Sequence, residues 1–324
     1  MIYKLEPYNG HKTRYKCPNC KKHKTFTRYI NTETNEYLSE NVGICNRRIK
    51  CNYHYTPKNY FDNNKNLSTP VKNIKKVQLV KKTSKKDNSI SYIDESLVIE
   101  SLNKQKNNFI FFLEKLLGKK ETTYLKNLYK IGTSDHWQNS TVFWQIDEKL
   151  KVRSGKIMLY NKNSGKRVKT PYNYINWIHK TEKLKNYNLK QCLFGLHLIN
   201  QNKNLPIGIV ESEKTAIIAS VYIDQFIWLA CGSVNNLNYE NTKALKGRNV
   251  VLFPDLNCFD LWSKKIKHLF PLANYRVSDV LEKNSSIEEK KSGYDLADYL
   301  IHFQRINKEL IKRKKENEAY IDSN

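Results

Sequence analysis

Four cysteines within the first 51 residues constrain the fold of this chain more than any other feature. Cys17 and Cys20 are two residues apart, and Cys45 and Cys51 follow after a gap of 24 residues. A spacing of two residues lets both thiolates reach one Zn²⁺ at about 2.3 Å, and the gap has room for a small hairpin. In a reducing compartment, clustered cysteines bind metal more often than they form disulfides. The pattern predicts a zinc ribbon over residues 1–61.

Two sets of zinc ligands fit this region. The four cysteines are the favoured set; the alternative has His54 in place of one sulfur, and His23 is a weaker candidate. Protein atoms fill every position in either set, so we expect the zinc to be structural. So small a domain buries too little surface to fold alone, and the metal should contribute most of its stability. The few apolar contacts are expected from Phe26, Tyr29 and Tyr37.

The chain has a formal net charge of +26 and a sequence pI of about 9.6. Such a surplus raises affinity for polyanions, although a solvated lysine-rich surface gives the same composition. The ribbon region has its own basic residues, which we expect to contact phosphates while neighbouring aromatics stack on bases. They are Lys21, Lys22, Lys24, Arg28, Arg47, Arg48 and Lys50.

No stretch reaches the roughly 18 apolar residues of a membrane span, and the first 15 residues have no apolar signal core. A cytoplasmic location without a membrane partner is therefore expected. Cys192, Cys231 and Cys258 are scattered, and we interpret them as ordinary buried thiols.

Four further regions follow the ribbon. Residues 62–90 carry eight lysines and few large apolar residues, which is typical of a flexible basic linker. Residues 91–203 read as a mixed α+β domain, with a helix from Asp94 through Leu117 and antiparallel strands with tight turns within 141–169. A parallel-sheet domain is expected over 204–301, followed by a basic C-terminal helix and tail over 302–324. The helix of this tail is expected to run from Leu296 to about Asn317.

The region over 204–301 alternates between strand and helix patterns. Strands are expected at 205–210, 226–230, 249–253 and 275–277, with helical periods after the first and third. Such alternation indicates βαβ units and a Rossmann-like parallel sheet. The fold class predicted for the whole chain is therefore a multidomain α/β protein.

Acidic and amide side chains follow two of these expected strands. Glu211 comes directly after the first strand, and Asp255 and Asn257 follow the third. Functional residues of open parallel sheets gather at the carboxyl ends of strands, where carboxylates can share Mg²⁺ with phosphate oxygens. Asp295 and Asp298 are two more candidate ligands, although one of them is also suited to cap the last helix.

The segments GIVESEKTA and VVLFPDLN resemble the Toprim domain of bacterial replicative primases, topoisomerases and some nucleases. Glu211 matches the Glu of that family and Asp255 matches the first Asp of its Asp-x-Asp motif. The chain departs from the family at Asn257, which stands where the second Asp is expected, and at Ser212, where many members have Gly. GYDLADYL and the segments around 141–160 and 193–201 are also similar to primases, so the resemblance covers nearly the whole chain.

The resemblance implies that Glu211, Asp255 and Asn257 bind Mg²⁺ or Mn²⁺ with a nucleoside triphosphate, and that Glu211 takes part in proton transfer. Lys214, Arg153 and Lys156 would contact phosphate or template. The amide at Asn257 can still ligate Mg²⁺ but removes one negative charge from the site.

Three functions are compatible with the sequence. The first is a primase-like nucleotidyltransferase that acts on single-stranded DNA for a bacterial mobile element, with a helicase or another replication protein as its partner. The second is a catalytically weakened module that binds single strands, and the third is a Toprim nuclease.

Overall fold

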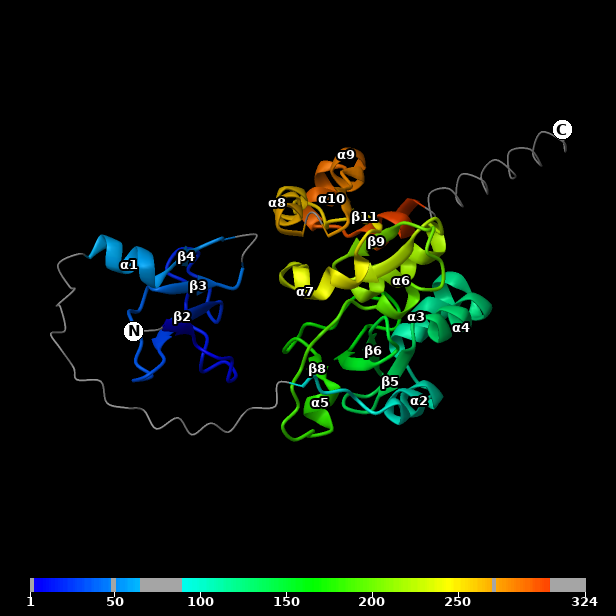
Figure 1. Cartoon of the computed structure of the whole chain (residues 1–324), viewed down its shortest axis with the longest axis horizontal. Coiled ribbons are helices and arrows are strands. Elements are labelled where there is room, and N and C mark those ends of the chain that lie inside the picture. Colours follow the sequence, from blue (N-terminus) through cyan, green and yellow to red (C-terminus); the bar gives the residue numbers. More distant parts are fainter. Residues whose placement is uncertain (1–2, 48–50, 65–88, 270–271, 304–324) are drawn as a thin grey trace, which may run out of the picture. The chain divides into compact units, whose positions relative to one another are not determined.

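The structure is a computed structural model that describes residues 3–47, 51–64, 89–269 and 272–303. It divides into two compact units, residues 1–85 and 86–324, which we call the ribbon unit and the core unit (Figure 1). Most of the predicted linker and the tail beyond residue 303 lie outside the described residues. The protein is thus of mixed α/β class, with a small antiparallel unit ahead of a larger one that contains a parallel sheet.

The ribbon unit is a four-stranded sheet in the order β1-β2-β3-β4. The hairpin predicted between the two cysteine pairs is confirmed, because β2 and β3 pair antiparallel with Phe26 opposite Cys45. Phe26, Cys17 and Cys45 form its small buried core. The elements are β1 (Tyr3–Leu5), β2 (Phe26–Asn31), β3 (Gly43–Cys45), β4 (His54–Tyr55) and α1 (Pro57–Asn63).

The first half of the core unit is an antiparallel sheet in the order β5-β6-β7-β8, with three helices before it. The predicted antiparallel strands are confirmed as the β6–β7 hairpin, in which Phe143 lies opposite Lys156. The elements are α2 (Glu95–Asn103), α3 (Asn108–Leu117), α4 (Lys119–Leu128), β5 (Ile131–Ser134), β6 (Ser140–Ile146), β7 (Val152–Met158), β8 (Ile175–Trp177), α5 (Ile178–Thr181) and the 3₁₀ helix η2 (Leu196–Leu198).

The prediction of one helix from Asp94 through Leu117 is wrong, because the chain leaves the helical conformation at Lys104. Asn107 begins a new helix there by accepting hydrogen bonds from the backbone N–H groups of Phe109 and Ile110. Its amide nitrogen donates to the carbonyl of Gly132 at 2.9 Å, so the break also attaches α3 to β5. A buried asparagine that can satisfy both ends of its side chain this way outweighs continuous helical periodicity.

The second half of the core unit is a parallel sheet in the order β10-β9-β11-β12. The runs IGIV and IWLA are buried throughout, as expected for strands covered on both faces. The elements are β9 (Ile207–Val210), α6 (Glu213–Tyr222), β10 (Ile227–Ala230), η3 (Val234–Asn236), α7 (Tyr239–Thr242), η4 (Lys243–Leu245), β11 (Asn249–Leu252), α8 (Phe259–Leu269), β12 (Asn274–Val277), α9 (Val280–Asn284), α10 (Ile287–Ser292) and a last helix over 296–303.

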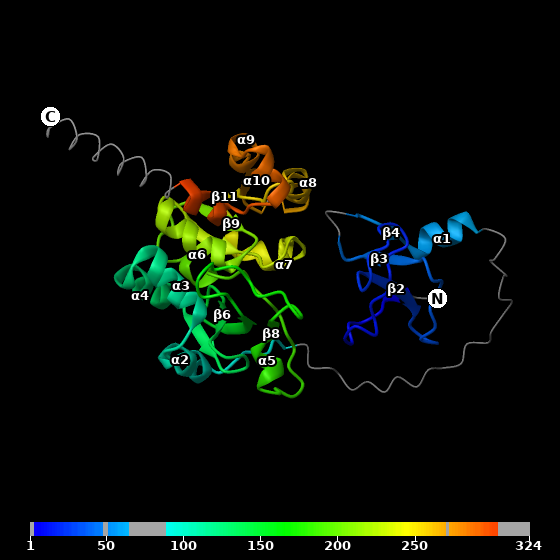
Figure 2. The same ribbon diagram turned by 180° about the vertical axis from the view of Figure 1, so that it is seen from behind.

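The two halves of the core unit share one hydrophobic cluster. Phe109, Phe143 and Tyr160 from the first half belong to the same buried cluster as Ile209 and Trp228 from the second. Seen from both sides, the antiparallel sheet and α8–α10 lie at opposite ends of this unit, with β9 and α6 between them (Figures 1 and 2). The boundary predicted at residue 204 therefore falls within one continuous core, and it stays a prediction.

None of the helices within the described residues is long and apolar enough to cross a membrane.

The role of Asn107 can be tested by comparing two helix caps. Asn107→Ala removes the cap of α3 and leaves buried partners on Gly132 and Thr141 unsatisfied, so we expect it to lower the free energy of unfolding by about 2–4 kcal/mol. Asp94→Ala removes the exposed cap of α2 and should cost only about 1 kcal/mol. Urea unfolding followed by tryptophan fluorescence measures both, because all five tryptophans lie in the core unit. Equal losses in the two variants would contradict this account of the helix break.

Candidate functional site

The four ribbon cysteines converge on one point. The sulfur of Cys17 lies 3.7 Å from that of Cys51, and the sulfur of Cys20 lies 3.9 Å from that of Cys45. All four sulfurs lie within 4.8 Å of one another. Thiolates about 2.3 Å from a tetrahedral zinc are about 3.8 Å apart, whereas a disulfide needs about 2.05 Å. The arrangement is a zinc-binding cysteine cluster.

The electrostatics of the cluster also fit a bound cation. A hydrogen bond from the backbone N–H of Lys22 lowers the pKa of Cys20 to about 6, which favours the thiolate that zinc requires. Burial raises the pKa of Cys45 to about 12, so its thiolate needs a neighbouring positive charge. Zn²⁺ supplies that charge when it is bound.

Neither histidine candidate belongs to the cluster. The side chain of His54 is exposed, and its Nε2 lies 2.9 Å from the hydroxyl of Tyr29. His23 is exposed as well. The favoured four-cysteine set is therefore the one that the geometry brings together.

The basic residues of the ribbon unit have varied surroundings. The guanidinium of Arg28 lies over the rings of Tyr15 and Tyr37, 4.1 and 5.6 Å from their centroids. The side chain of Arg47 contributes to lowering the pKa of Cys20. Arg48 and Lys50 lie outside the described residues.

A second candidate site is a cleft of about 430 Å³ in the core unit, which we call the acidic cleft. Parallel pairing of β9 with β11 brings their carboxyl ends together, so Glu211 and Asp255 both line it. Asp295 and Asp298 line it from the start of the helix over 296–303. Four of the five acidic and amide residues singled out in the sequence therefore meet in one cleft.

Burial raises the pKa values of Glu211 and Asp255. Burial, together with repulsion from Asp295 and Glu211, raises the pKa of Asp255 to about 8. Burial also raises the pKa of Glu211, against the opposing influence of Arg167 and Lys156. Carboxyl groups with raised pKa values favour a bound cation, because the cation offsets the cost of ionising them.

The acids are less tightly gathered than the cysteines. Within the described parts of the chain, the cysteine cluster is the only group of three or more His, Cys, Asp or Glu side chains whose ligand atoms all lie within 4.8 Å. Mg²⁺ keeps several waters and is usually completed by phosphate oxygens, so it does not require a closed protein cage. Glu211 and Asp255, with Asp295 beside them, therefore suit a magnesium or manganese ion held together with a phosphate.

Basic residues that sequence reasoning missed also line the cleft. Lys166, Arg167 and Lys169 line it from the turn that follows β7. Gly165 fixes this turn: its φ is +63°, and an added Cβ would lie 2.4 Å from the ring of Phe112 in α3. The only sequence signal was the run GKRVK after a turn, which by itself is an ordinary exposed hairpin tip.

Lys156 lines the cleft but is paired with a residue that the sequence analysis did not single out. Its ammonium donates to both carboxylate oxygens of Glu213, at 2.9 and 3.1 Å, and both side chains are buried. This pair joins β7 to the first turn of α6. Lys156 is thus held between the two sheets.

Two predicted site residues lie elsewhere. The amide of Asn257 donates to the carbonyl of Lys290 at 2.9 Å, and Asn257 does not line the acidic cleft. Arg153 donates to buried Asp147 at 2.6 Å, which secures the β6–β7 turn, and it does not line the cleft either. The scattered thiols Cys192, Cys231 and Cys258 are buried, as expected.

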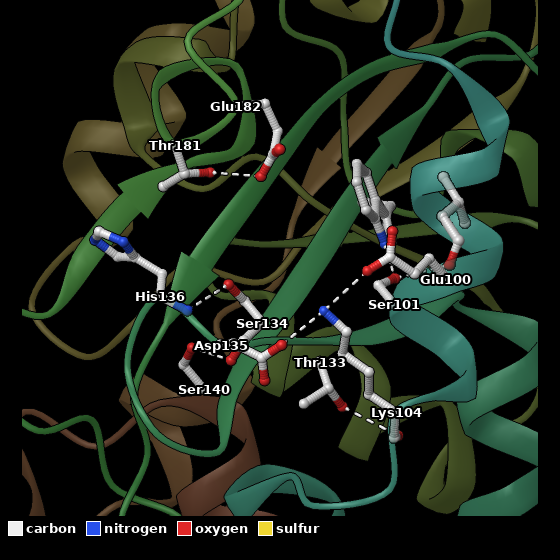
Figure 3. Close-up of polar contacts among 12 residues, drawn as sticks. Glu100, Ser101, Lys104, Thr133, Ser134, Asp135, His136, Ser140, Thr181 and Glu182 are labelled. Carbon is white, nitrogen blue, oxygen red and sulfur yellow. Dashed lines mark hydrogen bonds and ion pairs between the residues drawn. The ribbon is translucent and has the colours of Figure 1, made fainter.

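Another hollow, of about 280 Å³, lies between α2 and the end of β5 (Figure 3). Lys104 bridges Glu100 at 3.1 Å and Asp135 at 2.8 Å there, and Ser101 accepts a hydrogen bond from the indole of Trp144. Lys104 is taken up by these two carboxylates, and Glu182 accepts from the hydroxyl of Thr181, so we assign the hollow no chemistry.

Two family models match the chain. Residues 1–66 match a zinc beta-ribbon finger family, which agrees with the cysteine geometry. Residues 107–256 match a family described as "Domain of unknown function (DUF6371)". This second match runs from the cap of α3 past Asp255, across the boundary expected at residue 204. A comparison with curated protein sequences gave no significant match.

The solved structures similar to this chain include bacterial and phage primases. A DnaG primase catalytic domain bound to single-stranded DNA has 12% identity and a TM-score of 0.39, over 62% of this chain and 80% of that one. The primase fragment of the bacteriophage T7 primase-helicase has 13% identity and a TM-score of 0.35, over 86% and 98%. The zinc-binding and RNA polymerase domains of Aquifex aeolicus primase have 15% identity and a TM-score of 0.31, over 96% and 85%. Because these TM-scores are low, we base function on the geometry of the site.

Zinc content tests the cysteine cluster. Wild-type protein should bind close to one zinc ion per chain, and Cys45→Ser should lose it because three sulfurs leave the site open. His54→Ala is the matched control and should keep the metal. Atomic absorption after gel filtration measures both. A chain that loses zinc in His54→Ala but keeps it in Cys45→Ser would contradict the assignment.

The raised pKa of Asp255 predicts a pH dependence of stability. The folded state holds a proton on Asp255 up to about pH 8, whereas the unfolded carboxyl loses it near its ordinary value. Its contribution to stability is therefore fully present at low pH and is lost as the pH rises through 8. In magnesium-free buffer, wild type should lose stability relative to Asp255→Asn between pH 5 and 9, measured by urea unfolding. A difference that stays constant over this range would show that the pKa is not raised.

Proposed function

We propose that this chain is a primase-like protein that makes short primers on single-stranded DNA by magnesium- or manganese-dependent nucleotidyl transfer. The observation that carries the proposal is the acidic cleft, which carboxylates at the ends of adjacent parallel strands line together with a basic turn. The likeness of GIVESEKTA and VVLFPDLN to Toprim primases supports it. We extend the proposal to the replication or transfer of a mobile element, on the same likeness.

The acidic side chains of the cleft suit the metal of a metal-bound nucleoside triphosphate, and its basic side chains suit the phosphates. Glu211, Asp255 and Asp295 would hold the metal, which offsets charge on the phosphates when it is bound. Lys166, Arg167 and Lys169 would contact the phosphates, because guanidinium and ammonium groups donate several hydrogen bonds to phosphate oxygens. The volume of about 430 Å³ lies within the usual range for small-molecule sites. Asn257 would take no part in binding the metal.

Nucleotidyl transfer needs a group that accepts a proton. The attacking hydroxyl oxygen forms a bond to the α-phosphorus as the bond to pyrophosphate breaks, and the hydroxyl proton must leave. Burial raises the pKa of Glu211 above its ordinary value, which makes its carboxylate a better proton acceptor near neutral pH. Glu211 would thus accept the proton at the strand end, beside the phosphates.

The ribbon unit would bind the single-stranded template. Its zinc cluster gives a small unit a fixed surface, and Arg28 between Tyr15 and Tyr37 combines a cation with aromatic rings. Basic and aromatic side chains together bind single strands with little sequence preference. A helicase or another replication protein of the mobile element remains the proposed protein partner.

A primer-synthesis assay tests this function. Zinc-loaded full-length protein is incubated with single-stranded DNA, Mg²⁺ or Mn²⁺ and labelled nucleotides. Wild type should yield labelled oligomers, and Glu211→Gln and Asp255→Asn should each lower the rate by about 100-fold or more. Glu240→Gln is the matched control, because Glu240 is an exposed carboxylate that pairs with Lys190 and Lys243 outside the cleft.

The alternative outcomes separate the other functions. Cleavage of labelled single strands without nucleotides, lost in Glu211→Gln, would identify a nuclease instead. Folded protein that binds single strands but gives neither product would leave a binding module. Either result overturns the proposed synthesis.

A further inference from the structure

Lys214, in the first turn of α6, has its ammonium next to acidic side chains of the cleft. Its Nζ lies 3.1 Å from Oδ1 of Asp298 and 3.7 Å from Oδ2 of Asp295. Its side chain is only 11% exposed. Asp255 also acts on it through space, and together the three carboxylates raise the pKa of Lys214 against the opposing effect of burial. The lysine is therefore a fixed positive charge among three acids.

Asp295, one of the acids around Lys214, is held in place by other hydrogen bonds. Oδ1 of Asp295 accepts from the backbone N–H of Asp298 at 2.9 Å, and its Oδ2 accepts from the hydroxyl of Thr215 at 2.9 Å. These bonds fix Asp295 whether or not the lysine stays. The ammonium of Lys214 ends a four-carbon chain with several rotatable bonds, so it can leave Asp295 while that carboxylate stays in place.

Lys214 also borders the space where phosphates would lie. It lines the acidic cleft together with Lys166 and Arg167. Lys156, the other buried lysine of the cleft, is held by both oxygens of Glu213. Lys214 therefore differs from Lys156: it contacts the aspartates and also lines the cavity where phosphates would bind.

We propose that Lys214 is the counter-cation of the cleft acids when no ligand is bound. When metal and nucleotide bind, its ammonium leaves the carboxylates and binds a phosphate instead. This inference rests on the proposed function, because it assigns a role within the same cleft. Without ligand, the ammonium neutralises Asp295 and Asp298 and repels an incoming divalent ion. When a metal takes over that charge, the ammonium turns toward the triphosphate and donates to it.

The exchange predicts effects of opposite sign on two ligands. Lys214→Met removes the competing charge, so Mn²⁺ alone should bind about tenfold more tightly. The same variant lacks the ammonium for phosphate, so ATP should bind about tenfold more weakly at saturating Mn²⁺. Electron paramagnetic resonance measures bound Mn²⁺, and calorimetry measures ATP, on zinc-loaded full-length protein. A merely structural loss would weaken both ligands.

Two further variants serve as controls. Lys214→Arg keeps the charge and should stay within about threefold of wild type for both ligands. Lys185→Met removes an exposed charge that does not line the cleft and should change neither affinity appreciably.

The outcomes are separable from those of the proposed function. Manganese affinity that does not rise in Lys214→Met would overturn the counter-cation role, and unchanged ATP affinity would overturn the transfer to phosphate. If Glu211→Gln still weakens Mn²⁺ binding in those cases, the metal site of the proposed function stands. If Glu211→Gln leaves Mn²⁺ binding unchanged, the proposed metal site itself fails.

Discussion

Parallel pairing of β9 with β11 is the constraint on which the candidate site depends. The register sets Ile209 opposite Leu252, so the two strands end at the same edge and the next residues face one space. Burial at this edge raises the pKa values of Glu211 and Asp255, and repulsion from Glu211 adds to the effect on Asp255, so the folded state bears a cost for placing two carboxylates there. Hydrophobic burial of the strands provides the compensation, because IGIV and its neighbours lie in the largest apolar cluster. The carboxylates that would bind a metal at this edge therefore lower the stability of the fold.

The buried pair of Lys156 and Glu213 makes the cleft a joint product of both sheets. Lys156 comes from an antiparallel hairpin and Glu213 from the helix after β9, and each charge needs the other because neither has much access to water. Removal of one partner would leave an uncompensated charge at the junction. The antiparallel half is therefore part of the site, and the single core that spans residue 204 is consistent with this dependence.

The spacing of the cysteines was sufficient to predict the ribbon hairpin, and hydrophobic periodicity was sufficient to predict the parallel strands. The position of Glu211 and Asp255 after two of these strands was sufficient to predict that they lie close together. These patterns were insufficient where a single polar side chain decides the outcome. The cap at Asn107 depends on partners in β5 that are remote in sequence, and Asn257 turns away because the carbonyl of Lys290 accepts from its amide. Arg167 was not predicted as a site residue because exposed basic turns are common. Glu213 was not predicted because acids in the first turn of a helix are also common.

Gly165 restricts the backbone of the basic turn before a ligand binds. The positive φ of this glycine and its contact with the ring of Phe112 attach the basic turn to the same core that supports the strands. The backbone of Lys166 and Arg167 has thus lost much of its freedom during folding, before any nucleotide arrives. Association then costs less conformational entropy than it would with a loose loop, so more of each phosphate contact remains as affinity. Phe112 in α3, which does not line the cleft, is in this sense a determinant of ligand recognition.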